Sequence, residues 1–222
     1  QHLAMGAAMV REDAWERPAR FKPVDEEAQQ LRTTVGLLDI SPLGKLNIQG
    51  EDVEALLTAI FPGATLPSVG EVHKLDANAA NILGQVTLAR LAHDEFLALT
   101  GPDQGATLSE ALEAASAGCA HVFDLSSALA GARITGPSAR AVLEAISEFD
   151  SSQSYFPDMR CAQTKAAEIH GTLVRNDLGG LPSYQLFFGR DFGEYMWATL
   201  LEVVEHHGGI PVGLEAMALL QG

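Results

Sequence analysis

The sequence predicts an α+β protein built from two related lobes, each a mostly antiparallel sheet with helices on one face. The expected elements run β-α-β-β-β-α along the first half of the chain, and the same order follows in the second half. A short sequence echo accompanies this repeat. Asp-Ile-Ser at 39–41 leads through a strand to Gly50 and a helix, and Asp-Leu-Ser at 124–126 leads through a strand to Gly136 and a helix. The recurrence indicates two copies of one unit.

Length and composition agree with this organisation. The chain has 222 residues, of which 47% are hydrophobic and 19% charged, as is typical of a globular protein. We expect a first lobe over residues 25–115, preceded by an arm over 7–24, and a second lobe over 116–222. The two lobes are expected to form one domain together.

The first lobe is expected to begin with a helix over 25–34. Asp25 is predicted to cap it, Glu26 and Glu27 favour its first turn as solvated charges, and Gly36 follows its end. The preceding arm holds prolines and aromatic residues, and it is expected to be irregular and to lay its aromatic side chains on another surface.

Periodicity predicts the remaining elements. Those of the first lobe are a strand over 43–49, an amphipathic helix over 51–60, strands over 72–75, 82–91 and 95–100, and a helix over 107–115. Those of the second lobe are a strand beginning at 122–123, a strand over 129–135, a helix over 138–146, strands over 164–170 and 172–176 joined near Gly171, a strand over 183–188 and a helix over 191–208. Ile-Pro-Val at 210–212 and a last short helix follow.

Charge and cysteine content exclude several classes of function. The formal net charge is −15, which argues against binding to nucleic acid or to an anionic membrane surface. No apolar run approaches the length of a membrane-spanning helix. Cys119 and Cys161 form no metal-binding pattern, so we expect no metal and a reducing, cytoplasmic setting.

Motifs for nucleotide binding, for a nucleophilic serine and for a catalytic zinc are absent. One group of cations nevertheless stands out in this acidic chain. It consists of Arg160, Lys165, Arg175 and Arg190 in the second lobe. These residues could be ordinary surface charges or a local site for an anionic ligand or an acidic partner. Tyr184, Phe187 and Phe188 lie near them in the sequence, as sheet core or as a stacking wall for a flat ring.

Several segments, taken in order, resemble the glycine cleavage T-protein family. The opening segments are Val-Gly-Leu-Leu-Asp-Ile-Ser at 35–41 and Gly-Lys-Leu-Asn-Ile-Gln-Gly at 44–50. Ile-Thr-Gly-Pro-Ser-Ala at 134–139 and Pro-Val-Gly-Leu at 211–214 are similar to later family segments. The Phe-Pro-Asp-Met-Arg-Cys-Ala-Gln-Thr run at 156–164 looks like the gamma subunit of heterotetrameric sarcosine oxidase. So does the Phe-Gly-Arg run at 188–190 that leads into the next helix.

The resemblance implies a folate-binding fold, and tetrahydrofolate as its cofactor. Active members add a small C-terminal barrel, which we expect to be absent here, as in gamma subunits. In those members an aspartate in an Ile-Leu-Asp-Asp-like stretch assists near the pterin. The matching stretch here is Ile82-Leu83-Gly84-Gln85, without either carboxylate.

Two further departures concern the ligands. The family's aromatic-Glu step, whose carboxylate accepts hydrogen bonds from the pterin, matches Tyr184-Gln185. The family has a charged segment similar to Arg-Asp-x-x-Arg near the end of this region. The matching segment of this chain is Ala-Met-Ala-Leu at 216–219, which carries no charge. The residues that the resemblance assigns to folate are Tyr184, Gln185 and Gln85 near the pterin, with Arg175 or Arg160 near the glutamyl tail. No catalytic residue is assigned.

Three functions stay open. The first is a non-catalytic accessory subunit resembling the sarcosine oxidase gamma chain, bound to a larger flavin- or folate-binding subunit. The second is a tetrahydrofolate-dependent aminomethyltransferase or demethylase with altered pterin ligands. The third is iron–sulfur repair, which in relatives uses a reactive cysteine. Cys161 lies in Arg-Cys-Ala-Gln and is expected to be a structural strand residue instead.

Overall fold

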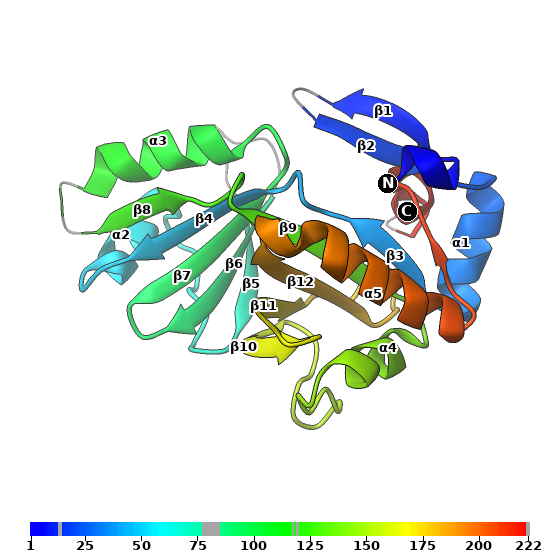
Figure 1. Ribbon diagram of the computed structural model, residues 1–222. Coiled ribbons are helices and arrows are strands. Elements are labelled where there is room, and N and C mark those ends of the chain that lie inside the picture. Colours follow the sequence, from blue (N-terminus) through cyan, green and yellow to red (C-terminus); the bar gives the residue numbers. More distant parts are fainter. Residues whose placement is uncertain (13–14, 77–84, 117, 119, 221–222) are drawn as a thin grey trace. The chain divides into compact units, whose positions relative to one another are not determined.

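The computed structural model describes residues 1–12, 15–76, 85–116, 118 and 120–220 (Figure 1). It confirms the α+β class with antiparallel sheets. The chain forms two compact units. The first comprises Gln1–Ser41, Ala130–Asp158 and Gln163–Gly222, and the second comprises Pro42–Leu129 and Met159–Ala162. Each unit therefore draws on both halves of the sequence, whereas the sequence analysis divides the chain consecutively near residue 115.

The first unit is organised around a six-stranded sheet with the order β10-β11-β12-β9-β3-β13. Its strands are β3 (Gly36–Asp39), β9 (Leu129–Thr135), β10 (Arg160–Ala166), β11 (Ile169–Arg175), β12 (Ser183–Gly189) and β13 (Ile210–Pro211). Its helices are α1 (Val24–Thr33), α4 (Ala139–Ile146), α5 (Gly193–His206) and α6 (Leu214–Ala218). Figure 1 shows α5 running across β9 and β12.

The second unit contains a five-stranded antiparallel sheet with the order β5-β6-β7-β4-β8. Its strands are β4 (Gly44–Gln49), β5 (Val72–Asp76), β6 (Gln85–Ala92), β7 (Glu95–Thr100) and β8 (His121–Asp124). Helices α2 (Val53–Ile60) and α3 (Gly105–Ser116) bury their apolar sides against one face of this sheet, which carries Leu46, Ile48 and Phe96. The strand predicted to begin at residue 82 is described from Gln85, because residues 77–84 lie outside the described part of the chain.

Hydrogen bonds at the two Asp-x-Ser segments confirm the internal repeat. Asp39 Oδ1 accepts from the Ser41 N–H at 2.8 Å, and Asp124 Oδ1 accepts from the Ser126 N–H at the same distance. Each serine hydroxyl then accepts a backbone N–H from the other copy: Ser41 from Gly131 at 3.1 Å and Ser126 from Lys45 at 3.0 Å. The two copies therefore exchange strands, which explains why both units are discontinuous in sequence.

Two predicted local features are wrong. The arm before α1 is a hairpin of β1 (Ala8–Glu12) and β2 (Trp15–Arg20), and not an irregular segment. The turn expected near Gly171 lies at Ala167 and Glu168, which adopt φ values of 46° and 66°. Gly171 pairs with Phe188 inside β11, and a Cβ there would come 2.6 Å from the Phe187 carbonyl oxygen. The glycine is required by this close approach and not by a turn.

The start of α1 also differs from the prediction. The helix begins at Val24 after Pro23, and no side chain caps it, so Asp25 lies within the first turn instead. Glu27 is fully buried, although it was expected to be a solvated charge. Its Oε1 accepts the N–H groups of Phe21 and Lys22 at 2.5 and 2.7 Å. The sequence could not show this, because the donors come from the chain that folds back over the helix.

The second oxygen of the Glu27 carboxylate joins a distant segment to the same helix. Oε2 accepts the N–H of Gly213 at 2.8 Å, immediately before α6. A Cβ at Gly213 would lie 2.0 Å from the Ala19 carbonyl oxygen, so only glycine permits this approach. One buried carboxylate thus holds together β2, α1 and α6.

We expect Glu27→Ala to lower the free energy of unfolding by about 3 kcal/mol or more, because three backbone donors lose their acceptor. Glu27→Gln keeps one acceptor oxygen and should cost less. Urea denaturation followed by circular dichroism measures both effects.

Glu26 provides the matched control. Its carboxylate is exposed and forms an ion pair with Lys22, and Glu26→Ala should change stability by no more than about 0.5 kcal/mol. Equal effects of the two alanine substitutions would contradict the role assigned to Glu27.

Candidate functional site

Tyr184 is a buried residue of the β12 strand, 1% exposed. It pairs across the ladder with Arg175 of β11, whose guanidinium carbon lies 5.5 Å from the centre of the Tyr184 ring. Burial raises the pKa of the Tyr184 hydroxyl, and the nearby Arg175 charge only partly offsets this. Tyr184 is therefore a neutral phenol at physiological pH.

Arg175 is tied to protein groups on three of its nitrogens. Its Nε and Nη2 donate to the two carboxylate oxygens of Asp177, each at 3.0 Å, and its Nη1 donates to the Phe156 carbonyl at 2.6 Å. Burial disfavours the charge, but the hydrogen bonds to Asp177 and the nearby acidic groups of Tyr184, Asp177 and Asp158 together outweigh it and raise the pKa of the guanidinium. Its predicted contact with a glutamyl tail stays a prediction, and it would have to compete with this bidentate pair.

Gln185 follows on the opposite face of the same strand. The side chain is 5% exposed, and its Oε1 has no hydrogen-bond partner in the described part of the chain. This is the position where the resemblance implies a carboxylate that receives pterin donors. The structure therefore presents a buried acceptor that is free to receive an N–H group.

Gln85 and Arg160 belong to the second unit. Gln85 is exposed at the start of β6, where its amide donates to Asp76 at 3.5 Å. Arg160 is about one-third exposed and forms an ion pair with Glu71 at 3.3 Å. Tyr184 and Arg175 are thus brought together on one face of β11 and β12, and Gln185 lies on the opposite face. The ligand roles of all five residues remain predictions.

Arg133 is a charged residue on β9 that sequence reasoning did not select. Its Nε donates to the Ser183 hydroxyl at 2.9 Å, and its Nη2 donates to the Asn176 carbonyl at 3.1 Å. Burial lowers the pKa of the guanidinium to about 10. The available signal was a single cation inside the otherwise uncharged strand Leu-Ala-Gly-Ala-Arg-Ile-Thr at 129–135.

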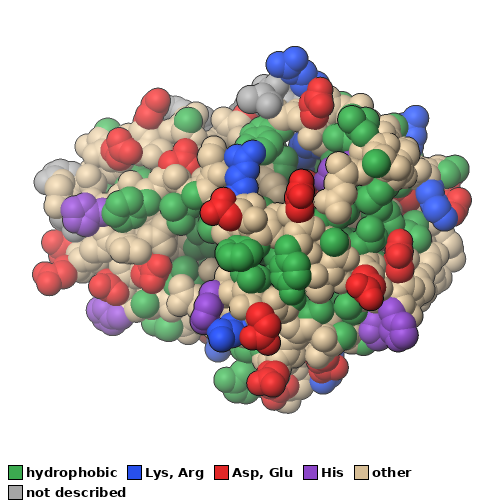
Figure 2. Space-filling view, viewed as in Figure 1, with side chains coloured by type: hydrophobic (Ala, Val, Ile, Leu, Met, Phe, Trp, Pro, Cys, Tyr) green, Lys and Arg blue, Asp and Glu red, His purple; other side chains and the backbone are tan. Residues whose placement is uncertain are grey.

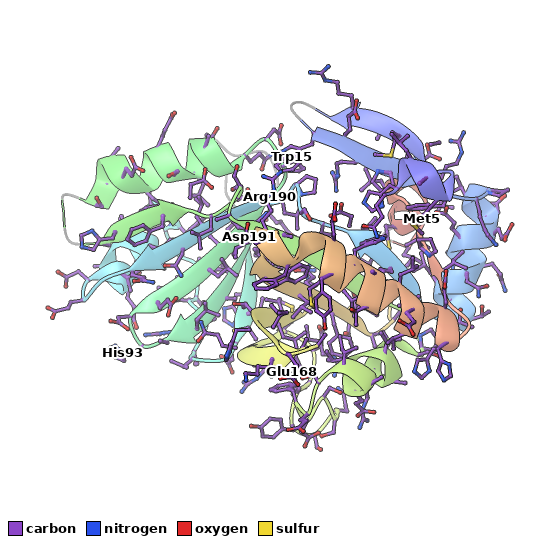
Figure 3. All side chains as sticks on the ribbon, in the orientation of Figure 1. Met5, Trp15, His93, Glu168, Arg190 and Asp191 are labelled. Atoms are coloured by element: carbon purple, nitrogen blue, oxygen red, sulfur yellow. The ribbon has the colours of Figure 1, made fainter. Side chains whose placement is uncertain are left out.

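The other predicted cations lie at the surface of the first unit. Figure 3 shows Arg190 beside Trp15, and its guanidinium carbon is 5.9 Å from the centre of the indole ring. This contact gives the aromatic arm a partner within its own unit. The face shown in Figure 2 carries many acidic side chains, in line with the net charge, together with hydrophobic ones.

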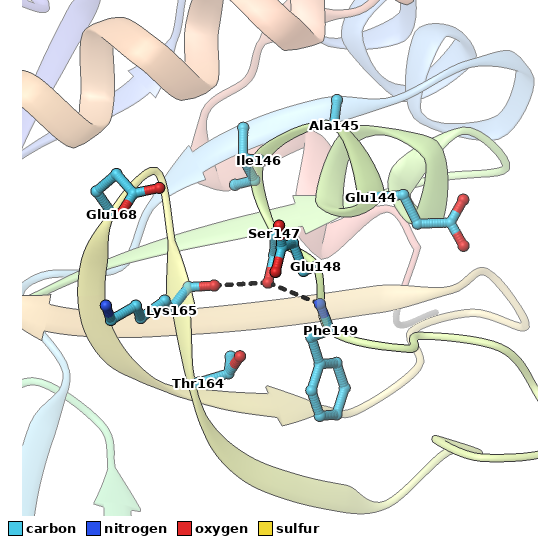
Figure 4. Close-up of a pocket in the computed structure, with 9 residues that line it drawn as sticks. All are labelled: Glu144, Ala145, Ile146, Ser147, Glu148, Phe149, Thr164, Lys165 and Glu168. Carbon is cyan, nitrogen blue, oxygen red and sulfur yellow. Dashed lines mark hydrogen bonds between the residues drawn. The ribbon is translucent and has the colours of Figure 1, made fainter.

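A surface hollow of about 780 Å³ lies where α4 ends and β10 turns into β11 (Figure 4). Ser147 lines this hollow. Its hydroxyl donates to the Lys165 carbonyl at 2.5 Å and accepts the Phe149 N–H at 3.2 Å. Its other lining residues include three carboxylates, Glu144, Glu148 and Glu168. None of the five predicted ligand residues lines it, so it does not coincide with the predicted folate site.

Cys161 is buried in β10, as expected of a structural residue. Burial raises the pKa of its thiol to about 12, and the Sγ donates to the carbonyls of Glu71 and Arg90 at 3.5 and 3.4 Å. Cys119 lies outside the described residues. Within the described ranges, no group of three or more potential metal-ligating side chains occurs, and no helix is long and apolar enough to cross a membrane.

We expect Cys161 to resist alkylation in the native protein, because only a fraction of about 10⁻⁵ is thiolate at pH 7. Iodoacetamide labelling followed by mass spectrometry measures this in a Cys119→Ser background, where Cys161 is the single thiol. Labelling should become rapid in urea, and rapid labelling of the folded protein would contradict the structural role.

Comparison with known proteins confirms the predicted resemblance. The GCVT N-terminal domain family matches residues 1–221. The chain is 28% identical to the sarcosine oxidase subunit alpha of Rhizobium meliloti, over 97% of this chain and 24% of that protein. It is 24% identical to the aminomethyltransferase of Moorella thermoacetica, over 100% of this chain and 61% of that protein. The chain thus spans less than two thirds of the length of these curated relatives.

Solved structures show the same fold. The glycine cleavage system aminomethyltransferase T from Bartonella henselae superimposes with a TM-score of 0.81 at 22% identity, covering 99% of this chain and 59% of that one. A chain of the heterotetrameric sarcosine oxidase from Corynebacterium sp. U-96 gives 0.66 at 22% identity, covering 84% of this chain and 93% of that one. With its fold and nearly its whole length matched, this chain belongs to the GCVT N-terminal domain family.

Proposed function

We propose that this chain is a non-catalytic accessory subunit, similar to the sarcosine oxidase gamma chain, that works in the cytoplasm beside a larger flavin- or folate-binding subunit. The observation that carries the proposal is Gln185. A buried amide stands where the family resemblance implies a pterin-binding carboxylate, and its Oε1 has no partner in the described residues. A glutamine offers one acceptor where a carboxylate offers two, so a pterin would keep one donor unmatched.

The other replaced positions support the same reading. Ile82-Leu83-Gly84-Gln85 contains no carboxylate that could exchange protons near a pterin, although residues 82–84 lie outside the described part of the chain. At the other end, Ala216 and Met217 are buried in α6. Apolar packing thus takes the place of the charged pair that the resemblance implies there.

The alternative function, a tetrahydrofolate-dependent aminomethyltransferase or demethylase, makes a different prediction about binding. Calorimetric titration with 5-formyltetrahydrofolate should give little or no heat with the wild-type chain up to about 1 mM ligand. Gln185→Glu should tighten binding about tenfold, because restoring the second acceptor recovers about 1–3 kcal/mol.

Gln29→Glu is the matched control, since Gln29 is exposed on α1 and the substitution adds the same charge. It should leave the titration unchanged. Micromolar binding by the wild-type chain would overturn the accessory assignment and support the transferase, with Tyr184 and Gln185 at the pterin.

The accessory role also predicts a stable complex. Pull-down with the tagged chain from the cells that naturally produce it should recover a larger subunit, and the complex should carry flavin absorbance through size-exclusion chromatography. Separate elution of the two proteins would argue against this partner. Exposed aromatic residues of the first unit, Tyr155, Phe192 and Tyr195, are candidate contacts.

A further inference from the structure

The side of α5 that faces away from the sheet carries two exposed aromatic residues. Phe192, just before the helix, and Tyr195 in its first turn are 45% and 51% exposed. Their spacing of three positions places them on the same side of the helix, while Met196 and Leu200 are fully buried on the other side. Figure 2 shows hydrophobic side chains over the start of α5, with acidic ones beside them. Adjacent exposed aromatic side chains are typical of a surface that a partner covers.

Acidic side chains border this aromatic pair. Residues 191–206 contain four carboxylates and neither lysine nor arginine. The carboxylates belong to Asp191, Glu194, Glu202 and Glu205, and all four residues are exposed. The preceding cation, Arg190, lies against Trp15, with its guanidinium carbon 5.9 Å from the centre of the indole ring. The surface is therefore apolar at its centre and negatively charged at its border.

The acidic border continues from α5 to the surface hollow beside α4. The Tyr195 hydroxyl donates to the Ala167 carbonyl at 3.3 Å, which brings the ring next to the turn between β10 and β11. The next residue, Glu168, lines the hollow together with Glu144 and Glu148. The aromatic pair and the hollow therefore adjoin each other on the surface of the first unit.

The hollow itself combines apolar and acidic side chains (Figure 4). Ile146 and Phe149 are half-buried in its lining. Two of its carboxylates, those of Glu148 and Glu168, form no ion pair with any described residue, and Lys165 is the one cation among the described lining residues. A lysine or arginine side chain suits such a hollow, because its carbon chain packs on apolar groups while its charged end reaches the carboxylates.

Charge and shape decide what covers this surface. A second copy of the chain would place one acidic border against another, and a net charge of −15 also repels nucleic acid and anionic membranes. The outer side of a helix is convex, so a small molecule would leave the two rings in water. A protein surface with basic side chains around an apolar cleft satisfies both the rings and the carboxylates.

We propose that the surface formed by Phe192, Tyr195 and the adjoining hollow, the α5 face, docks onto an apolar cleft of the larger subunit that is bordered by lysine and arginine. The two rings enter the cleft, and a basic side chain of the partner extends into the hollow towards Glu148 and Glu168. This inference rests on the proposed accessory role, to which it adds the place of contact and the chemistry of the partner's surface.

Quantitative pull-down from the cells that naturally produce the chain tests the aromatic centre of the α5 face. The amount of larger subunit retained by each tagged variant is measured by mass spectrometry relative to the tagged chain. The double substitution Phe192→Ala and Tyr195→Ala should lower retention at least tenfold, because buried aromatic anchors carry much of the energy of an interface. Both residues are exposed, so the double variant should keep its fold, and circular dichroism checks this.

Two matched controls limit the effect to this face. Tyr195→Phe keeps the ring and removes only the hydroxyl, so this variant should retain the larger subunit as the wild type does. Phe123→Ala removes an aromatic side chain of similar exposure, 49%, from β8 of the second unit, and retention should not change.

Salt and charge test the acidic border. Raising the NaCl concentration of the binding buffer from about 0.05 to about 0.5 M should lower retention severalfold, because exposed charges are screened. Combining Glu148→Gln with Glu168→Gln should weaken retention and reduce this salt dependence. The photo-crosslinking residue p-benzoylphenylalanine at position 195 should attach to a peptide of the larger subunit in which apolar residues lie next to lysine or arginine.

The outcomes separate this proposal from the accessory role. Loss of retention by the alanine pair, salt dependence and a cross-link to such a peptide support the α5 face as the docking surface. Equal retention by the alanine pair, or a cross-link from position 195 to a second copy of this chain or to an acidic peptide, would overturn the docking surface and leave the accessory role intact. Failure of the wild-type chain to retain any larger subunit would overturn both.

Discussion

The buried carboxylate of Glu27 must be paired with hydrogen-bond donors, and the arrangement of the first compact unit depends on this requirement. Glu27 meets this need with the backbone N–H groups of Phe21, Lys22 and Gly213, so the hairpin, α1 and the segment before α6 are positioned together. Removing the carboxylate would leave these donors buried and unpaired, which costs more than the loss of one ordinary contact. Gly213 is part of the same constraint, because any side chain there would collide with Ala19.

The same requirement distinguishes the arginines of the central sheet. Arg175 is satisfied by Asp177 and by the Phe156 carbonyl, and it supports the ring of Tyr184 from across the ladder. Arg133 is only partly satisfied, by neutral groups. Where the resemblance implies an acidic, donor-accepting site, this chain combines a neutral Gln185 with a cation on the same face.

The organisation into interleaved units follows from the two Asp-x-Ser segments. Each aspartate fixes a local turn, and each serine hydroxyl receives a backbone N–H from the other copy. As a result β3 pairs with β9, and β4 pairs with β8, although neither pair is close in sequence. Because Asp39 and Asp124 form the same local turn, the echo was recognisable from the sequence. The exchange of strands depends on pairing between segments far apart in the sequence, so no local pattern predicts it.

The sequence by itself determined the α+β class, most helices and strands, the internal repeat and the family, because periodicity and turn residues act over short distances. The resemblance also implied that Gln185 stands where the family has a carboxylate. Only the tertiary structure decided which charges are buried and what satisfies them. Glu27, expected in solvent, is enclosed by chain that returns from both ends, and Arg133 was overlooked because its missing counter-charge depends on β11 and β12. Such partners are set by packing between distant segments, which a linear pattern does not encode.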